Sequence, residues 1–138
     1  MGEILFRAKA INRDNGYHRT KYKNGDWVYG LVTRLYDERF ENLPAEMTNT
    51  SGVSGIEVDY KTIGQYIGLT DKNGQKIFEG DIVDILTENE EIGVITYDEG
   101  GFVVKADGFC VDFHNNINGT DLEVIGSIHD NPELLKGE

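Results

Sequence analysis

The stretch from Ile63 to Leu86 constrains the fold more than any other part of the sequence, because two apolar runs flank a polar turn. Asn73-Gly74 lies in that turn and supplies the positive φ angles that a two-residue hairpin requires. Apolar and polar residues alternate on both sides, as in half-buried strands. Glu79-Gly80-Asp81 predicts a second corner, and Gly68 marks a sharp bend in a strand. The stretch therefore predicts a small, curled β-barrel.

Other strands are predicted where β-branched and aromatic residues cluster or alternate with polar ones. Trp27–Tyr36 is the longest such segment. A hairpin turn is expected at Asp98-Glu99-Gly100. Asn131 and Pro132 suit the N-cap and first position of a short C-terminal helical turn. The remaining predicted strands lie near residues 4–8, 56–60, 93–97, 101–105, 109–113 and 122–128, which makes the chain mainly β.

The segment Asp37–Gly55 lacks a clear strand pattern and contains a proline, two glycines and several Ser, Thr and Asn residues. It predicts a long loop, with room for one helical turn at Pro44–Met47. On this interpretation residues 1–55 form an N-terminal β segment with a long loop, and residues 56–138 form a barrel-like domain. A single continuous domain over 1–138 is the alternative, since this length suits one domain of ordinary size.

Charge is distributed unevenly along the chain, whose net charge is −12. Residues 1–34 hold seven basic against three acidic side chains, a local +4, so the remaining residues carry −16. An acidic surface repels a phosphate backbone, which argues against direct nucleic-acid binding except through the first 34 residues. The simplest reading is an ordinary solvated surface. A basic segment that contacts an acidic body of a neighbouring subunit is the alternative.

Cys110 is the only cysteine, so no intramolecular disulfide can form and a Cys-based zinc site is excluded. The first residues, MGEILFRAKAI, contain two basic side chains and no long apolar run, and no stretch of membrane-spanning length occurs elsewhere. We therefore expect a cytoplasmic protein without a membrane partner.

Cys110, Asp112 and His114 alternate along one predicted strand and would share a face. The two outer residues would lie about 13 Å apart along the backbone, too far for a Cys/His catalytic pair. A plain polar face is therefore favoured. His18 and His129 are far away in sequence, and Thr70–Gly74 lacks the later carboxylates of a calcium loop. The sequence thus predicts no catalytic, metal or cofactor residue and no enzyme.

Aromatic residues are frequent in the first third of the chain. Trp27, Tyr29 and Tyr36 lie on the long early strand, and Tyr17 and Tyr22 precede it. Packing in the core explains such residues in most proteins, whereas an exposed set forms a recognition surface. Trp27, Tyr29 and Tyr36 are therefore the candidate interaction residues.

Three stretches resemble the YopX family of phage- and prophage-encoded proteins: EILFRAKAI near the start, GQYIGLTDKNGQKIFEGDIV in the middle and EVIGSIHDNPELL near the end. The resemblance implies a β-rich fold with an SH3-like barrel in the C-terminal part, a phage origin and a cytoplasmic location. It implies no reaction, because the family has no established biochemical function.

These observations predict a non-enzymatic interaction or assembly protein that forms a homo-oligomer and could also bind a host or phage protein. In this hypothesis the N-terminal arm pairs with or covers a strand edge of a neighbouring subunit. The alternative is an acidic decoy whose carboxylates imitate nucleic-acid phosphates and occupy a host protein. A hydrolase or nuclease is disfavoured, because the acidic residues show no metal-binding spacing.

Overall fold

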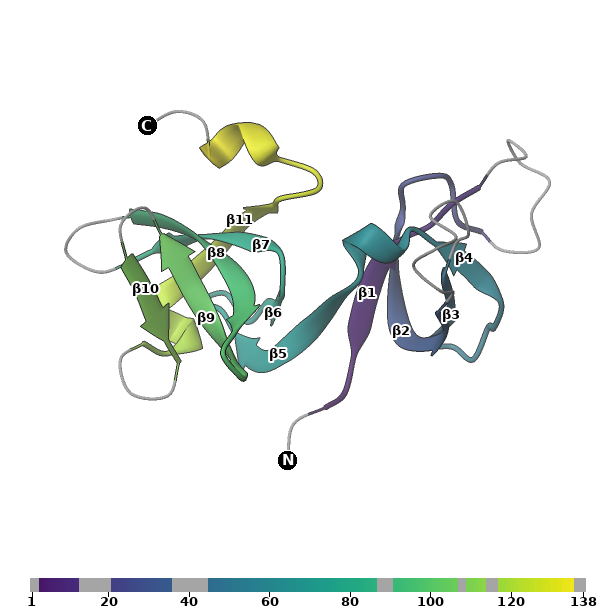
Figure 1. Cartoon of the computed structure of the whole chain (residues 1–138), viewed down its shortest axis with the longest axis horizontal. Coiled ribbons are helices and arrows are strands. Elements are labelled where there is room, and N and C mark those ends of the chain that lie inside the picture. Colours follow the sequence, from purple (N-terminus) through teal and green to yellow (C-terminus); the bar gives the residue numbers. More distant parts are fainter. Residues whose placement is uncertain are drawn as a thin grey trace. The chain divides into compact units, whose positions relative to one another are not determined.

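The computed structural model describes residues 3–12, 21–35, 45–86, 91–106, 109–113 and 117–135 (Figure 1). Backbone contacts divide the chain into two compact units, Glu3–Gln65 and Tyr66–Glu138, called here the N-terminal and C-terminal units. Each unit contains its own cluster of buried apolar side chains. A separate core is the mark of a unit that is held together by its own packing.

Four short strands form the antiparallel sheet of the N-terminal unit, in the order β4-β3-β2-β1, and the first residues of β5 pair with β1. Their bounds are β1 Phe6–Lys9, β2 Trp27–Arg34, β3 Ala45–Asn49 and β4 Ile56–Val58. Phe6 lies opposite Gly30 on one side and Gln65 on the other. Both edges of β1 are therefore occupied within the chain, which corrects the expectation of an extended N-terminal arm.

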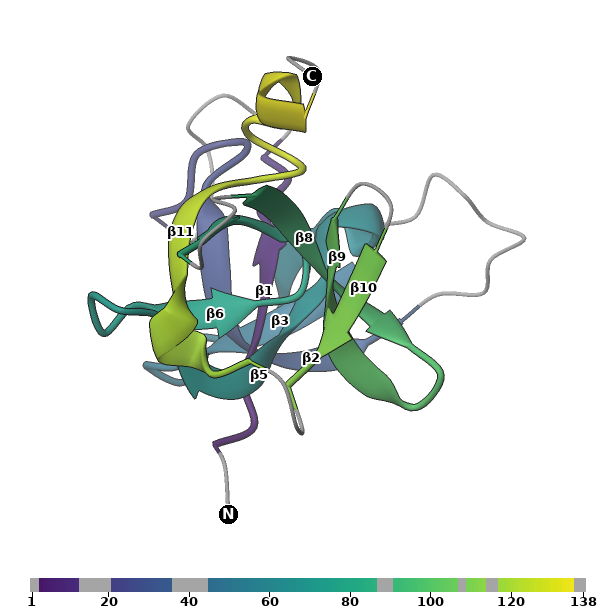
Figure 2. The same cartoon turned by 90° about the vertical axis from the view of Figure 1, so that its left-hand side faces the viewer.

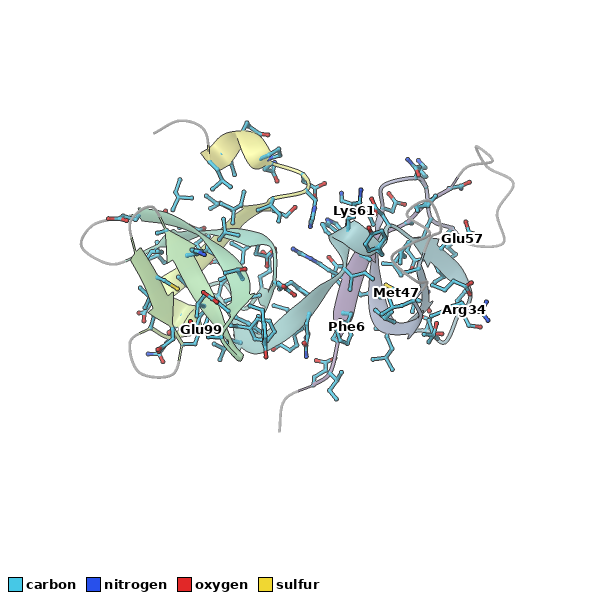
Figure 3. The ribbon with its side chains drawn as sticks, in the orientation of Figure 1. Phe6, Arg34, Met47, Glu57, Lys61 and Glu99 are labelled. Atoms are coloured by element: carbon cyan, nitrogen blue, oxygen red, sulfur yellow. The ribbon has the colours of Figure 1, made fainter. Side chains whose placement is uncertain are left out.

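The prediction of a loop or helical turn is wrong for residues 45–49, which form β3. Residues 36–44 lie outside the described residues. Ala45 and Met47 point into the core, 1% and 0% exposed, while Glu46 points outward (Figure 3 labels Met47). Pairing with β2 and β4 on both sides supplies backbone hydrogen bonds that outweigh the weak strand preference of alanine.

The C-terminal unit contains a five-stranded antiparallel sheet in the order β10-β9-β8-β7-β11 (Figure 2 labels all of these strands except β7). Its strands are β7 Asp81–Ile85, β8 Glu91–Asp98, β9 Gly101–Ala106, β10 Phe109–Asp112 and β11 Leu122–Ser127. Within the described residues this sheet is open, since β10 and β11 each pair with one neighbour. The mainly β fold is confirmed, whereas a closed SH3-like barrel is not.

The core of the C-terminal unit combines side chains from the five-stranded sheet with others from β5, Gly64–Thr70, and β6, Lys76–Phe78. Ile77 of β6 is fully buried against it, and Ile67 and Leu69 of β5 pack at its margin. Its other buried members are Val83, Ile85, Ile95, Val104, Ile117 and Leu122. The predicted strand pair around Asn73-Gly74 is therefore part of this core.

The turn between β5 and β6 is longer than the predicted two-residue turn. Thr70 pairs with Lys76, and the Gly74 N–H donates to the Asp71 carbonyl at 3.0 Å. Gly74 has a φ of 81°, but Asn73 does not adopt positive φ. The Asp71 carboxylate accepts hydrogen bonds from the backbone of Asn73 and Gln75, which favours this wider turn.

Glu79-Gly80-Asp81 forms the predicted second corner, between β6 and β7. Gly80 has a φ of 92°, and the Phe78 N–H donates to the Asp81 carboxylate at 2.8 Å. Asp81 is 1% exposed, so this hydrogen bond is shielded from water. The corner is thus fixed both by glycine and by a buried side-chain acceptor.

Short 3-10 helices complete the structure: η1 Tyr60–Thr62, η2 Gly119–Asp121 and η3 Pro132–Leu135. The sequence-based division at residues 55 and 56 differs from the observed one, because β4 and η1 belong to the N-terminal unit. In the described residues there is no helix with the length and hydrophobicity needed to cross a membrane.

The hairpin between β8 and β9 turns at Asp98-Glu99-Gly100, as predicted, and it has the two-residue turn that was expected at Asn73-Gly74. Asp98 pairs with Gly101, and the central residues Glu99 and Gly100 have φ angles of 48° and 87°. Both central residues of a type I′ turn require positive φ, which favours Asn or Gly over Glu. Glu99 therefore occupies a position that is unfavourable for its own backbone.

Replacing Glu99 by asparagine should raise the free energy of unfolding by about 1 kcal/mol, because asparagine tolerates this conformation. Urea denaturation followed by far-ultraviolet circular dichroism measures the change. Asp98→Asn removes the same charge next to it without relieving the backbone, and is the matched control. Equal stabilisation by both variants would attribute the effect to charge and contradict the backbone explanation.

Candidate functional site

The outward face of the N-terminal sheet carries the candidate residues that the sequence suggested. Along β2, Val28 and Val32 point into the core, while Trp27, Tyr29 and Leu31 point the other way. Tyr29 is 40% exposed and Leu31 is 50% exposed. Because β1 and β3 flank β2, this stripe lies on a central strand and not at an edge.

Two cations from β1 accompany this stripe, of which Lys9 is partly exposed and Arg7 is buried, at 6% exposed. Arg7 lies opposite Tyr29, and Lys9 lies opposite Trp27. The Arg7 guanidinium carbon is 4.3 Å from the centre of a Trp27 ring, and the Lys9 Nζ is 4.6 Å from it. Both distances are within the range of cation–π attraction. We call the set Arg7, Lys9, Trp27, Tyr29 and Leu31 the aromatic–basic face.

The same side of the sheet becomes acidic toward β3 and β4. Glu46 pairs directly with Glu57, and both alternate with core residues of their strands. Arg34 of β2 forms an ion pair with Glu46 at 3.7 Å (Figure 3 labels Arg34 and Glu57). Arg7 and Lys9 therefore lie at the β1 side of this sheet face, whereas the β3–β4 side carries Glu57 and the Arg34–Glu46 ion pair.

The other predicted aromatics do not join this face. Tyr22 packs against the N-terminal core, and its hydroxyl oxygen accepts a hydrogen bond from the Asn49 side chain at 3.1 Å. Tyr36 and Tyr17 lie outside the described residues. Of the three predicted interaction residues, the structure therefore brings together Trp27 and Tyr29.

A hollow of about 670 Å³ lies in the C-terminal unit, where the end of β5, the β8–β9 hairpin and β10 meet. Phe102 is held in its wall by an edge-on contact with Tyr97, with ring centres 5.3 Å apart. We call this site the acidic hollow; its lining residues are apolar (Ile67, Leu69, Phe102, Val103, Phe113), acidic (Asp98, Glu99, Asp112), or small (Gly100, Gly101, Cys110).

Cys110 and Asp112 thus share a face of β10, as their alternation predicts, and both line the acidic hollow. Cys110 is exposed and forms no disulfide. His114 and His18 lie outside the described residues. In the part of the chain that the structure describes, no cluster of three His, Cys, Asp or Glu side chains could hold a metal ion.

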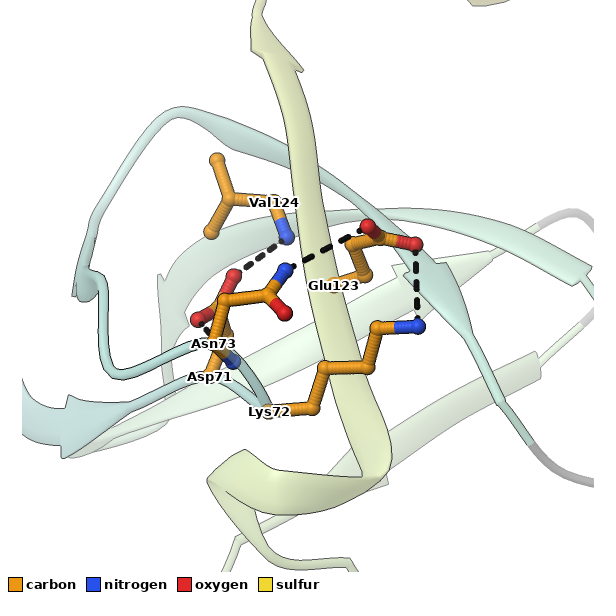
Figure 4. Close-up of polar contacts among 5 residues, drawn as sticks. All are labelled: Asp71, Lys72, Asn73, Glu123 and Val124. Carbon is orange, nitrogen blue, oxygen red and sulfur yellow. Dashed lines mark hydrogen bonds and ion pairs between the residues drawn. The ribbon is translucent and has the colours of Figure 1, made fainter.

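Asp71 is a buried carboxylate with a structural role (Figure 4). It accepts backbone hydrogen bonds from Asn73, Gln75 and Val124, each at 2.9 Å. Burial raises the pKa of Asp71, but these three N–H donors and the nearby Lys72 more than offset burial, so its pKa lies below the ordinary value. Asp71 therefore fastens the β5–β6 turn to β11.

A second contact joins the same segments on the surface. Lys72 forms an ion pair with Glu123 at 3.5 Å, and the Asn73 side-chain amide lies 3.4 Å from the other oxygen of that carboxylate (Figure 4). Both residues of the pair are partly exposed, so the pair contributes little to stability. The acidic and amide groups of this turn bind the protein itself, as the turn reading of Thr70–Gly74 predicts.

Comparison with known proteins identifies the family. The sequence model of the family described as YopX protein matches residues 6–136. The chain belongs to the YopX family. The crystal structure of protein EF1440 from Enterococcus faecalis is similar to this YopX family member, with a TM-score of 0.54 and 27% sequence identity. That similarity covers 98% of this chain and 99% of the other, so it includes both units. No curated protein matches.

Sequence reasoning missed several residues of the two sites in this YopX family member. Leu31 follows from the alternation of β2 and could have been included. Arg7 and Lys9 could not be placed beside Trp27 without the register between β1 and β2. The acidic hollow joins segments that lie more than 40 residues apart in sequence, such as Ile67 and Cys110, and no local pattern indicates it.

Proposed function

We propose that this YopX family member is a non-enzymatic interaction protein, encoded by a phage or prophage, that self-associates in the cytoplasm of its bacterial host. The aromatic–basic face is the observation that carries the proposal. The phage origin and location rest on the family resemblance. Partial closure of the C-terminal sheet by β5 and β6, which share its core, supports an SH3-like type for that unit.

The composition of the aromatic–basic face supports a role as an interface. An antiparallel sheet with one face in water normally alternates apolar residues inside with polar residues outside. In the first five residues of β2 the outward side chains are instead aromatic or aliphatic, and Tyr29 and Leu31 are about half exposed. Trp, Tyr and Arg are the residues most enriched at the energetic centres of interfaces.

The charge distribution across this side of the sheet supports contact with a second copy. In a two-fold dimer each subunit offers the same surface, so that surface must complement itself. Rotation about such an axis can place Lys9 of one subunit near Glu46 and Glu57 of the other, while the buried Arg7 supports Trp27 from within its own subunit. The apolar stripe on the central strand then lies between the two charged margins.

Sedimentation velocity over a concentration series tests the proposal. We expect a dimer with a dissociation constant on the order of micromolar, because two half-exposed apolar side chains per subunit are a small driving force against association entropy. Tyr29→Ser combined with Leu31→Ser should shift the protein to a monomer. Truncation of residues 1–36 is unsuitable, since it would remove two strands of the sheet.

Tyr60→Ser combined with Val53→Ser is the matched control. These residues belong to the same unit and are similarly exposed, at 38% and 42%, but lie outside the aromatic–basic face. The control should dimerise like the parent protein. A parent protein that stays monomeric throughout, or equal behaviour of both variants, would contradict the proposal.

An acidic decoy is the second candidate, and the division of charge between the units favours it. The N-terminal unit holds nine basic and nine acidic side chains, whereas residues 66–138 hold four basic and sixteen acidic ones. The whole net charge of −12 therefore belongs to the C-terminal unit. A decoy should capture basic nucleic-acid-binding proteins from host lysate at low salt and release them at high salt. Capture that does not depend on salt would exclude it.

A further inference from the structure

We propose that the acidic hollow binds a short basic segment of a partner protein, with a lysine or arginine against its carboxylates and an adjacent aliphatic side chain on its apolar wall. This site lies in the C-terminal unit and does not include the aromatic–basic face. The inference therefore goes beyond self-association and does not depend on it.

The charge of the lining residues selects a cation. Asp98, Glu99 and Asp112 line the hollow, and of its described lining residues none is Lys, Arg or His. No described residue forms an ion pair with Asp98 or Glu99. A positive group that enters therefore meets the Asp98 and Glu99 carboxylates without displacing a described cation from them, and the net charge of the unit attracts it from a distance.

The apolar wall selects an aliphatic neighbour. Ile67 and Leu69 lie two residues apart on β5, while Phe102 and Phe113 come from the other strands around the hollow. Ligand sites combine such walls with a few polar groups that fix orientation. A volume of about 670 Å³ admits several side chains but not a folded domain. The fitting occupant is a short peptide segment with basic and aliphatic residues.

The conformation of Glu99 is consistent with this assignment. Its carboxylate is carried to the rim of the hollow by a turn position that disfavours glutamate (Figure 3 labels Glu99). Backbone strain of this kind is retained where it has a use, although strain alone does not identify one. Here the acidic side chains and the apolar wall of the hollow indicate the ligand, a basic and aliphatic peptide segment.

Titration with three labelled pentapeptides tests the proposal on the full chain: Lys-Leu-Lys-Leu-Arg, Lys-Ser-Lys-Ser-Arg and Glu-Leu-Glu-Leu-Glu. Amide chemical shifts of the ¹⁵N-labelled protein show where each binds. The first peptide should shift residues 98–103 and 110–113 at submillimolar to millimolar concentration. The second should bind more weakly, and the third should not bind. Shifts confined to other residues, or equal binding of all three, would overturn the proposal.

Asp98→Asn combined with Glu99→Gln should weaken binding of the first peptide about fivefold, as expected for two partly exposed ion pairs. Glu79→Gln combined with Glu133→Gln changes the net charge equally outside the hollow and is the matched control. Equal weakening by both pairs would mean non-specific attraction and overturn the site. Tyr29→Ser combined with Leu31→Ser should leave peptide binding unchanged, which separates this result from the self-association test.

The single cysteine supplies an independent measurement. Cys110 lines the hollow and is exposed. Because it is the only cysteine in the sequence, pyrene maleimide attaches a bulky group at this position alone. Alkylated protein should lose binding of the first peptide while keeping its circular dichroism spectrum. Full binding after complete alkylation would place the peptide outside the hollow and overturn the proposal.

Discussion

Replacing Gly30 by alanine should destabilise the N-terminal unit by about 3 kcal/mol. This is the upper end of the usual cost of overpacking, because the added methyl group meets backbone atoms that cannot move aside. A Cβ at Gly30 would overlap the Thr48 carbonyl oxygen and lie 2.8 Å from the Asn49 Cα. These are backbone atoms of β3, which is paired on both sides with β2 and β4. They cannot move aside without breaking hydrogen bonds of the sheet.

Trp27 is the only tryptophan and lies on β2, so its fluorescence during urea denaturation reports on the N-terminal unit. Gly101→Ala is the control, because a Cβ there has no atom within 4 Å and its φ is not positive. An unchanged midpoint for Gly30→Ala would show that β2 and β3 are not as close as described.

Replacing Asp71 by asparagine should lower the stability of the C-terminal unit by about 2–3 kcal/mol at pH 7. The carboxylate accepts three backbone hydrogen bonds through two oxygens. An asparagine amide can accept those from Asn73 and Gln75, but its NH₂ group then faces the Val124 N–H. One buried donor loses its acceptor, and the β5–β6 turn loses its link to β11.

The effect of Asp71 should depend on pH, because its pKa is lowered in the folded protein. A lowered pKa gives stability that is fully present above the unfolded pKa of about 3.9 and is lost as the pH falls through the folded value. The stability difference between the parent and Asp71→Asn should therefore shrink below about pH 4. Urea denaturation at pH 7 and pH 3 measures it, with Asp98→Asn as the exposed control. A constant difference would contradict the role of ionised Asp71.

Strong local signals predicted much of the fold. β2 followed from its run of β-branched and aromatic residues, and the Glu79-Gly80-Asp81 corner followed from its central glycine. β3 was missed because Ala45, Glu46 and Met47 have little intrinsic preference for strands. Its conformation depends on β2 and β4, which are distant in sequence, and on burial in a shared core.

The turns show a second limit of local reasoning. Asn73-Gly74 has the preferred sequence of a two-residue turn, but the Asp71 carboxylate draws it into a wider one. Glu99-Gly100 has a less favourable sequence and nevertheless forms the two-residue turn, since the pairing of β8 with β9 imposes it. The hydrogen bonds of the Asp71 side chain and the pairing of the flanking strands therefore decided these turns, rather than the identity of the two central residues.

The two candidate sites could also be predicted only in part from local sequence. Alternation along β2 places Trp27 and Tyr29 on one face, and alternation along β10 places Cys110 and Asp112 on another. Neither pattern says which other strands complete those faces. The cations beside Trp27 depend on the β1–β2 register, and the wall of the acidic hollow depends on β5.

β5 belongs to both units, and this limits where the gene can be divided to produce the units separately. Gln65 pairs with Phe6 in one unit, and the very next residue, Tyr66, pairs with Phe78 in the other. No spacer separates the two ladders, so a gene cut at the unit boundary would leave Gly64 and Gln65 of β5 on one product and Tyr66–Thr70 on the other. A two-residue remnant at a chain end frays easily, and fraying would expose the edge of β1 to aggregation. Although the protein has two cores, it should be expressed and altered as one piece.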